Sequence, residues 1–293
     1  MTTATAYPSA QPPGAVSVEE LQRAWRAVQA GQFRRPHPKP AQTRTTASDP
    51  ACASPPSPRV WVPAEPVLPV LGCAGSVGAS TVALALASVA TGTGGTARVV
   101  ECCTATASGL AGASTAELGQ HPSGWVQGTR GQILLERASD ILVGPDNVPL
   151  PANSRHPVTL TVLDIGWELG QLLASSGWLG DQVLQARRLV AVTTATIPGL
   201  RRLEGALAML QGIPVAAAVV GPRRRNWPRM VHHSMGALTR QLDRDGDLHQ
   251  VPYDRDLANR GLDSAPLSTA LLTAVGELLH AGDGAATTTG KPS

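Results

Sequence analysis

The stretch from Val67 to Ala87 most constrains what this chain can fold into. An apolar run, Val67–Leu71, predicts a short buried strand, and a run of small apolar residues, Thr81–Ala90, predicts a helix. The sequence GCAGSVGAS joins them, with glycines at every third position. Strand, glycine turn and helix in this order form a phosphate cradle. Glycines let backbone N–H groups approach a polyanion, and the helix N-terminus adds about half a positive charge.

The same stretch lacks the charge of a working phosphate loop. Such a loop ends Gly-Lys-Ser/Thr, and its lysine reaches the β- and γ-phosphates. The corresponding residues here are Gly78-Ala79-Ser80, with no lysine nearby. The sequence therefore predicts the frame of a phosphate site without its principal cation.

Composition indicates a soluble, cytoplasmic protein. The 293 residues allow one large domain or two small ones, and a hydrophobic fraction of 42% suffices for a core of Ala, Val and Leu. A net charge of +3 is too small to indicate nucleic acid by itself. The four cysteines lack metal-ligand spacing, and the adjacent Cys102 and Cys103 suit buried thiols in a reducing compartment. We find no signal pattern and no apolar run of about 20 residues, so we expect no membrane span.

Residues 1–58 are expected to form a disordered arm and linker, because they are rich in Pro, Ser, Thr and Ala. One short helix is predicted within them at about 17–31, where Leu21, Trp25 and Val28 recur on one face. Two interpretations stay open. The helix either packs on the main domain or binds a protein partner on a flexible tether, with Trp25 as the anchor.

Residues 59–280 are expected to form one α/β domain, followed by a disordered tail at 281–293. Apolar strands alternating with helices indicate a doubly wound, mainly parallel sheet with helices on both faces. In such folds ligands sit beyond the carboxyl ends of the strands. Further strands are predicted at Ala97–Cys103, Gln132–Glu136, Asp140–Val143, Val158–Asp164, Leu189–Thr194, Ile213–Val220 and His249–Val251. Further helices are predicted at Pro198–Leu210, Met230–Leu242 and Leu267–Leu279.

The glycine spacing alone leaves a dinucleotide site open. Gly72-x-x-Gly75-x-x-Gly78 matches the turn of some NAD(P)-binding folds, and Glu101 ends the second strand near the position of a ribose-binding acid. The rest of the chain disfavours an oxidoreductase, because a short-chain reductase needs a Tyr-x-x-x-Lys pair. The sequence contains no such pair.

Several segments, in order and spacing, indicate a more specific relationship. They are Ala74–Thr81 (AGSVGAST), Asp140–Pro145, Asp164-Ile165-Gly166, Val190–Leu203 and Val251–Asp254 (VPYD). Together they resemble the MinD/ParA group of deviant (SIMIBI-class) P-loop ATPases, whose loop reads K-G-G-x-G-K-[ST]-T. The ending Gly78-Ala79-Ser80-Thr81 is similar to that of the TadZ/CpaE and septum-site-like branch. The resemblance covers the chain from Val67 to Leu279 and implies a P-loop NTPase-like fold.

The resemblance also implies a nucleotide site and a Mg²⁺ site. In the family, Mg²⁺ is held by a serine or threonine of the loop and by the acidic motif. The corresponding residues here are Ser80 and Asp164. The nucleotide-binding residues that it implies are Gly75, Ser76, Val77, Gly78, Ala79, Ser80, Thr81, Pro252 and Tyr253. ATP with Mg²⁺ is the expected ligand, and a homodimer is the family's usual assembly.

Departures from the family pattern limit catalysis. Both family lysines are alanines, Ala74 and Ala79, and Cys103 stands where an acid usually activates water. Because a transition-state cation is a main electrostatic term in phosphoryl transfer, we expect no appreciable hydrolysis. The resemblance then implies a degenerate, nucleotide-gated or pseudo-ATPase factor that positions or regulates a bacterial machine for secretion, pilus assembly, conjugation or partition. A slow ATPase that uses arginine, or an NAD(P)-binding oxidoreductase, is the alternative.

A basic run offers substitutes for the missing lysines. Arg223, Arg224 and Arg225 follow the Ile213–Val220 strand, at the expected ligand edge of the sheet. They either contact phosphate or a partner, or form an exposed basic loop. With Arg201-Arg202 they also leave open a weak, non-specific contact with DNA.

Overall fold

The computed structural model describes residues 60–92, 94–152 and 157–280. Its strands are β1 (Val67–Gly72), β2 (Ala97–Cys102), β3 (Ala116–Gln120), β4 (Trp125–Arg130), β5 (Ile133–Ala138), β6 (Leu160–Ile165), β7 (Leu189–Thr194), β8 (Val215–Gly221) and β9 (Leu248–Pro252). Its α-helices are α2 (Ala79–Thr91), α3 (Leu169–Leu173), α4 (Trp178–Leu184), α5 (Ile197–Met209), α6 (Arg229–His233), α7 (Ala237–Arg244), α8 (Arg255–Arg260) and α9 (Thr269–His280).

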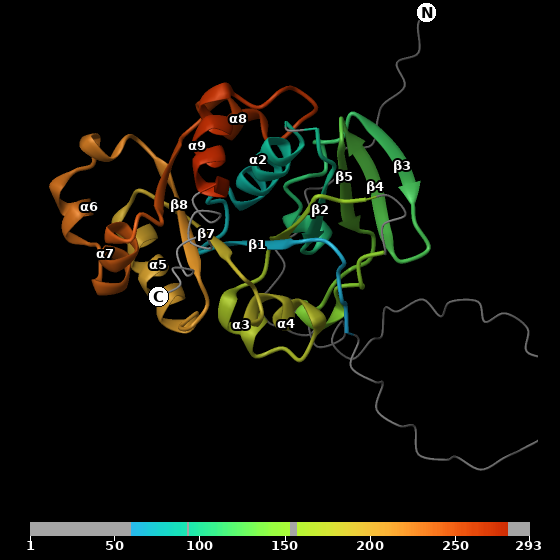
Figure 1. The fold of residues 1–293 in the computed structure, drawn as a ribbon, viewed down its shortest axis with the longest axis horizontal. Coiled ribbons are helices and arrows are strands. Elements are labelled where there is room, and N and C mark those ends of the chain that lie inside the picture. The colour runs from blue at the N-terminus through green and yellow to red at the C-terminus, as the bar shows by residue number, and fades with distance from the viewer. Residues whose placement is uncertain (1–59, 93, 153–156, 281–293) are drawn as a thin grey trace, which may run out of the picture. The chain divides into compact units, whose positions relative to one another are not determined.

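The strands of this region form one nine-stranded sheet in the order β3-β4-β5-β2-β6-β1-β7-β8-β9 (Figure 1). β4 pairs antiparallel with β3 and β5, and every other neighbouring pair is parallel. β1 therefore lies between β6 and β7, so that the stretch after β1 begins at the middle of the sheet. The predicted fold class, a doubly wound and mainly parallel sheet, is confirmed.

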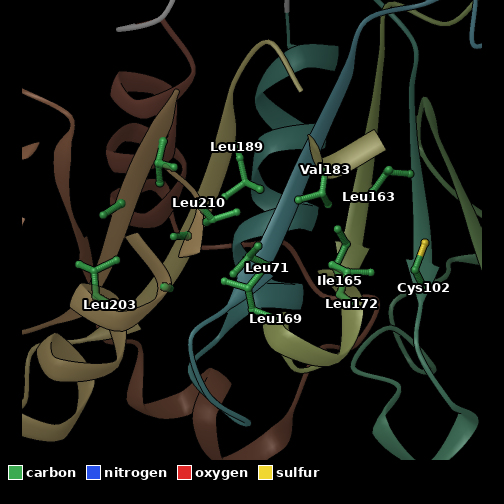
Figure 2. Packing of buried hydrophobic residues seen from close by; sticks show 14 of the residues in the cluster. Leu71, Cys102, Leu163, Ile165, Leu169, Leu172, Val183, Leu189, Leu203 and Leu210 are labelled. Carbon is green, nitrogen blue, oxygen red and sulfur yellow. The ribbon is translucent and has the colours of Figure 1, made fainter. Parts of the chain in front are cut away.

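Helices cover both faces of the sheet, which explains why its central strands are apolar throughout. On one face, α2 and α9 pack together over a core that includes Val82, Val99 and Val275. On the other face, α3, α4 and α5 enclose a second core, in which Leu71, Leu163 and the leucines of α3 and α5 meet (Figure 2). Four leucines of the helix predicted at Pro198–Leu210 are buried in this second core: Leu200, Leu203, Leu207 and Leu210.

The strand predicted at Asp140–Val143 is wrong. This segment is a loop in which Ile141 is 90% exposed, and a 3₁₀ turn, Pro145–Asn147, follows it. The physical reason is the pairing of β5, which ends at Ala138. β4 and β2 occupy both edges of β5, so no edge remains beside it for another strand.

Sequence patterns missed the β3–β4 hairpin. We expected a connection rich in small residues there, because β3 is exposed along its whole length and shows no apolar alternation. Its place at the edge of the sheet rests on pairing with β4. The short helices α3, α4 and α8 were not predicted either, since fewer than two full turns give little periodicity.

The single helix predicted at Met230–Leu242 is two helices, α6 and α7, separated at Gly236. The Glu204 carboxylate of α5 accepts hydrogen bonds from the backbone N–H groups of Leu238 and Thr239, each at 2.9 Å. In this way the Glu204 side chain caps the first turn of α7, as the side chain of an N-cap residue would. A Cβ atom on Gly236 would lie 2.0 Å from the carboxyl carbon of Glu204, so this position needs glycine.

The arm expected at 1–58, its helix at 17–31 and the tail at 281–293 lie outside the described residues. The predicted partner face of Leu21, Trp25 and Val28 therefore stays a prediction. In the part of the chain that the structure describes, no helix is both long enough and apolar enough to cross a membrane.

Candidate functional site

The loop between β1 and α2 has a defined conformation that its own packing maintains. The Cys73 N–H donates to the Val192 carbonyl of β7 at 2.8 Å, and the Val77 side chain is 7% exposed. Ser76 and Gly78 have left-handed backbones, with φ of 59° and 93°. At Gly78, the residue before α2, glycine adopts this conformation without the penalty that a Cβ would add. The conformation of the loop is therefore supported by contacts within the protein itself.

A cavity of about 1230 Å³ opens beside this loop. It lies at the carboxyl ends of β1, β6, β7, β8 and β9, where parallel sheets bind their ligands. The structure brings all the predicted nucleotide and Mg²⁺ residues to its lining: Gly75, Ser76, Val77, Gly78, Ala79, Ser80, Thr81, Asp164, Pro252 and Tyr253. The backbone N–H groups of the first turn of α2 have no partners within the helix, so they are donors for an anion here.

Asp164 and Ser80 form the polar floor of the cavity. Asp164 ends β6 with 3% of its surface exposed, and its carboxylate accepts a hydrogen bond from the Ser80 hydroxyl. Burial raises the pKa of Asp164 from its ordinary 3.8 to about 7, the Ser80 hydrogen bond opposes this, and the charge of Glu101 adds to it. The folded protein thus holds the proton of this carboxyl group more tightly than an ordinary aspartate does, and a divalent cation would favour its charged form.

Glu101 closes a neighbouring loop and does not line the cavity. Its carboxylate is 1% exposed and accepts hydrogen bonds from the Ser108 hydroxyl at 2.6 Å, the Gly109 N–H at 2.7 Å and the Leu110 N–H at 2.8 Å. In dinucleotide-binding folds, the strand that carries the ribose-binding acid is the direct neighbour of β1. Here β6 separates β2 from β1, so the sheet order speaks against a dinucleotide site.

The structure does not bring Arg223, Arg224 and Arg225 to the described lining of the cavity. The Arg224 guanidinium is paired with the Asp243 carboxylate of α7 and lies 5.9 Å from the centre of the Trp227 ring. Its backbone N–H donates to Gln250 at 2.9 Å, so the run is fixed beside α7. A partner contact by this run stays a prediction.

Arg202 and Trp167 line the cavity and were missed as site residues. Arg202 projects from α5 and is exposed, whereas Trp167 follows the β6 motif, and its buried indole N–H has no hydrogen-bond partner among the described residues. The Arg201-Arg202 pair was visible in the sequence, but its rotation around the helix was not.

The donor set of the cavity fits a magnesium nucleotide. The glycine cradle and the start of α2 suit phosphate oxygens, and the hydroxyl–carboxylate pair of Ser80 and Asp164 suits Mg²⁺. Tyr253, which is 61% exposed, offers an aromatic surface at the end of β9 for a base. Among residues 60–92, 94–152 and 157–280, no group of three or more His, Cys, Asp or Glu side chains could hold a metal. A magnesium ion held by Ser80 and Asp164 would complete its coordination with water and with phosphate oxygens of a ligand.

No protein-family model matches the chain, and no curated protein sequence matches it. Among solved structures, it is similar to a ParA family ATPase from Chlorobium tepidum TLS, at 15% identity over 74% of this chain and 98% of that one, with a TM-score of 0.45. It is similar to the septum site-determining protein MinD of Pyrococcus horikoshii OT3 in complex with Mg-ADP, at 14% identity over 78% and 99%, with a TM-score of 0.45.

A third similar structure is the MinC:MinD cell division complex of Aquifex aeolicus, at 13% identity over 78% of this chain and 98% of that one, with a TM-score of 0.47. By their descriptions, these proteins are of the MinD/ParA kind that the sequence resembles. The likenesses are remote, so what the site does has to follow from its own residues.

Proposed function

We propose that this chain is a degenerate P-loop protein of the MinD/ParA kind that binds Mg-ATP in the β1–α2 cavity and turns it over slowly or not at all. The observation that carries the proposal is a formed glycine loop next to the Ser80–Asp164 pair, in a cavity at the carboxyl edge of the sheet. Nucleotide occupancy then gates a homodimer or a protein partner that positions or regulates a larger bacterial machine.

Binding without a loop lysine is physically reasonable, provided that a divalent cation accompanies the nucleotide. Backbone N–H groups supply hydrogen bonds to phosphate whatever the side chain at Ala79. The lining also contains the carboxyl groups of Asp164, Glu168 and Asp254, which repel a bare polyanion. Mg²⁺ removes part of this repulsion, so we expect binding to depend on Mg²⁺.

Fast hydrolysis is not expected, because two parts of the usual machinery are absent from the sequence of residues 60–280. The two lysines of the chain are Lys39 and Lys291, so no lysine of this region can stabilise the transferring phosphoryl group. Cys103 stands at the water-activating position, and burial, with the charges of Glu101 and Asp164, raises its pKa well above the ordinary thiol value. A thiol that stays protonated cannot act as a general base at neutral pH.

Calorimetric titration of the full chain with ATP, ADP and NADPH, with and without Mg²⁺, tests the proposal. We expect Mg²⁺-dependent binding of ATP that weakens at least about tenfold in Ser80→Ala, the loss of one hydrogen bond to a charged group. Ser88→Ala is the matched control, since this hydroxyl lies on the same helix and donates to the Leu84 carbonyl at 2.8 Å.

Four results would overturn parts of the proposal. Binding of NADPH without ATP would replace it with a dinucleotide function, and binding of none of the three would remove nucleotide gating. Phosphate release on the order of 1 s⁻¹ or faster, the ordinary range of enzymes, would make the protein an ATPase. Light scattering with and without ATP measures whether bound nucleotide changes the molar mass of the protein. If ATP changes neither the molar mass nor the binding of a partner, the gating role is removed.

A further inference from the structure

We propose that Arg202 of α5 supplies the phosphate-binding positive charge that the glycine loop lacks; this inference rests on the nucleotide site proposed above. The loop carries Ala79 where a phosphate loop has its lysine, and the cavity extends from the loop to α5. A cation from another element can reach the same ligand if it lines the same cavity. Arg202 is the cationic side chain among the described lining residues.

The ion pairs of other arginines also bear on this assignment. Arginines of the described region are held by acidic side chains in six ion pairs: Arg98 with Glu65, Arg98 with Glu136, Arg137 with Glu117, Arg188 with Asp247, Arg224 with Asp243, and Arg260 with Asp263. None of the ion pairs found among the described residues includes Arg202. Its charge is therefore not committed to an acidic side chain of the described region, and among such arginines Arg202 is the one that lines the cavity.

The rotation of α5 places Arg202 rather than Arg201 in the cavity. Leu200, Leu203 and Leu207 are buried in the core, which fixes how the helix is turned. Residues three, four and seven positions after Arg202 share its side of the helix. These are Gly205, Ala206 and Met209, and all of them line the cavity together with Arg202.

The start of α5 is fixed by direct contacts with the carboxyl end of β7. The Thr196 hydroxyl caps the helix by accepting from the Gly199 N–H at 3.1 Å. A Cβ on Gly199 would lie 2.4 Å from the Thr194 carbonyl oxygen, so helix and strand approach closely there. Further along, a Cβ on Gly205 would meet no atom within 4 Å, which leaves open space beside Arg202. The guanidinium group thus has an anchored base and room to move.

The chemistry of this wall suits phosphate. A guanidinium group donates two parallel hydrogen bonds to phosphate oxygens, and it keeps its charge at every physiological pH. Arg202 also offsets the carboxyl groups of Glu168 and Asp254, which would otherwise dominate the field of the cavity.

The test compares Arg202→Ala with Arg201→Ala, its exposed neighbour that is not part of the described lining. Calorimetry with Mg-ATP, tripolyphosphate and adenosine separates the phosphate contact from the base contact. We expect Arg202→Ala to bind Mg-ATP and tripolyphosphate about 10- to 100-fold more weakly, with adenosine unchanged. Arg201→Ala should change each affinity less than about twofold, and Arg202→Lys should recover part of the loss because it keeps the charge.

The outcomes distinguish this inference from the proposed function. If the wild type binds Mg-ATP and Arg202→Ala binds it as tightly as Arg201→Ala does, the role of Arg202 is refuted and the nucleotide site stands. If the wild type binds tripolyphosphate but not ATP, and Arg202→Ala weakens it, the nucleotide proposal falls and the role of Arg202 stands. Binding of neither anion refutes both. Urea unfolding of each variant verifies that an exposed substitution left the fold intact.

Discussion

The pH dependence of stability should reveal the state of Asp164. Its carboxyl group is 3% exposed, and burial raises its pKa from 3.8 to about 7. Because the folded protein holds this proton more tightly than the unfolded chain does, the contribution to stability is complete below about pH 4 and is lost as the pH rises through 7. A shift of roughly three pH units corresponds to about 4 kcal/mol of unfolding free energy.

Asp164→Asn isolates this effect, because an amide keeps the shape and the acceptor oxygen for Ser80 but cannot ionise. Urea unfolding between pH 4 and pH 8 without Mg²⁺ should give similar unfolding free energies for both proteins at pH 4. By pH 8 the variant should be more stable by about 4 kcal/mol. Asp140→Asn, a change in an exposed loop, should follow the wild type at every pH. Parallel curves for the wild type and Asp164→Asn would refute a buried carboxyl group with a raised pKa at this site.

The same titration should appear in ligand binding. A bound divalent cation favours the ionised form of Asp164, so binding releases its proton wherever the group is still protonated. We expect Mg-ATP affinity to rise from pH 6 to pH 8 in the wild type and to stay flat in Asp164→Asn. Calorimetry in two buffers of different ionisation enthalpy measures the released proton, and equal heats in both buffers at pH 6 would contradict the linkage.

Two further pairs of substitutions test the packing of the fold. Gly236→Ala should destabilise the fold by about 1–3 kcal/mol in urea unfolding, because its Cβ would overlap the Glu204 carboxylate. Gly205→Ala, in a helix and with open space around it, should instead stabilise the fold by about 0.5–1 kcal/mol. Equal effects of the two substitutions would contradict the surroundings described for both glycines. Trp61→Ala should cost about 3–5 kcal/mol, since the ring is 5% exposed and lies edge-on to a second tryptophan at 5.2 Å. Val62→Ala, at a 79% exposed neighbour, should change stability by less than about 0.5 kcal/mol, and a similar loss in both would indicate that the segment is not packed as described.

Local patterns predicted the elements whose side chains meet a core along their whole length. The strand predicted at Leu189–Thr194 coincides with β7, and the helix predicted at Pro198–Leu210 overlaps α5, whose leucines are buried. Patterns failed where a contact with a residue far along the chain determines where an element begins or ends. α7 begins after Gly236, where Glu204 of α5 accepts hydrogen bonds from its first turn, a contact that no window of neighbouring residues contains.

The candidate site was predictable as far as topology alone places residues. The glycine loop and Asp164 follow parallel strands, and the carboxyl ends of such strands share one edge of the sheet. The cation was not predictable in this way. Arg202 lines the cavity because of the rotation of α5, and Arg224 is drawn to Asp243 on α7. The positions of both side chains depend on tertiary packing, which cannot be predicted from a run of two or three arginines in the sequence.

The frame of the phosphate loop and its charge are separable properties in this fold. The loop is shaped by the left-handed Gly78, by the buried Val77 and by the hydrogen bond from the Cys73 N–H to the Val192 carbonyl. None of these contacts involves a charged side chain, so a lysine at Ala79 is not needed for the loop to form. Because contacts within the protein hold the frame, they reduce the cost of ordering the loop when a ligand binds. The charge that a polyphosphate requires is then free to come from any element bordering the cavity, and α5 is the element of the described cavity that offers one.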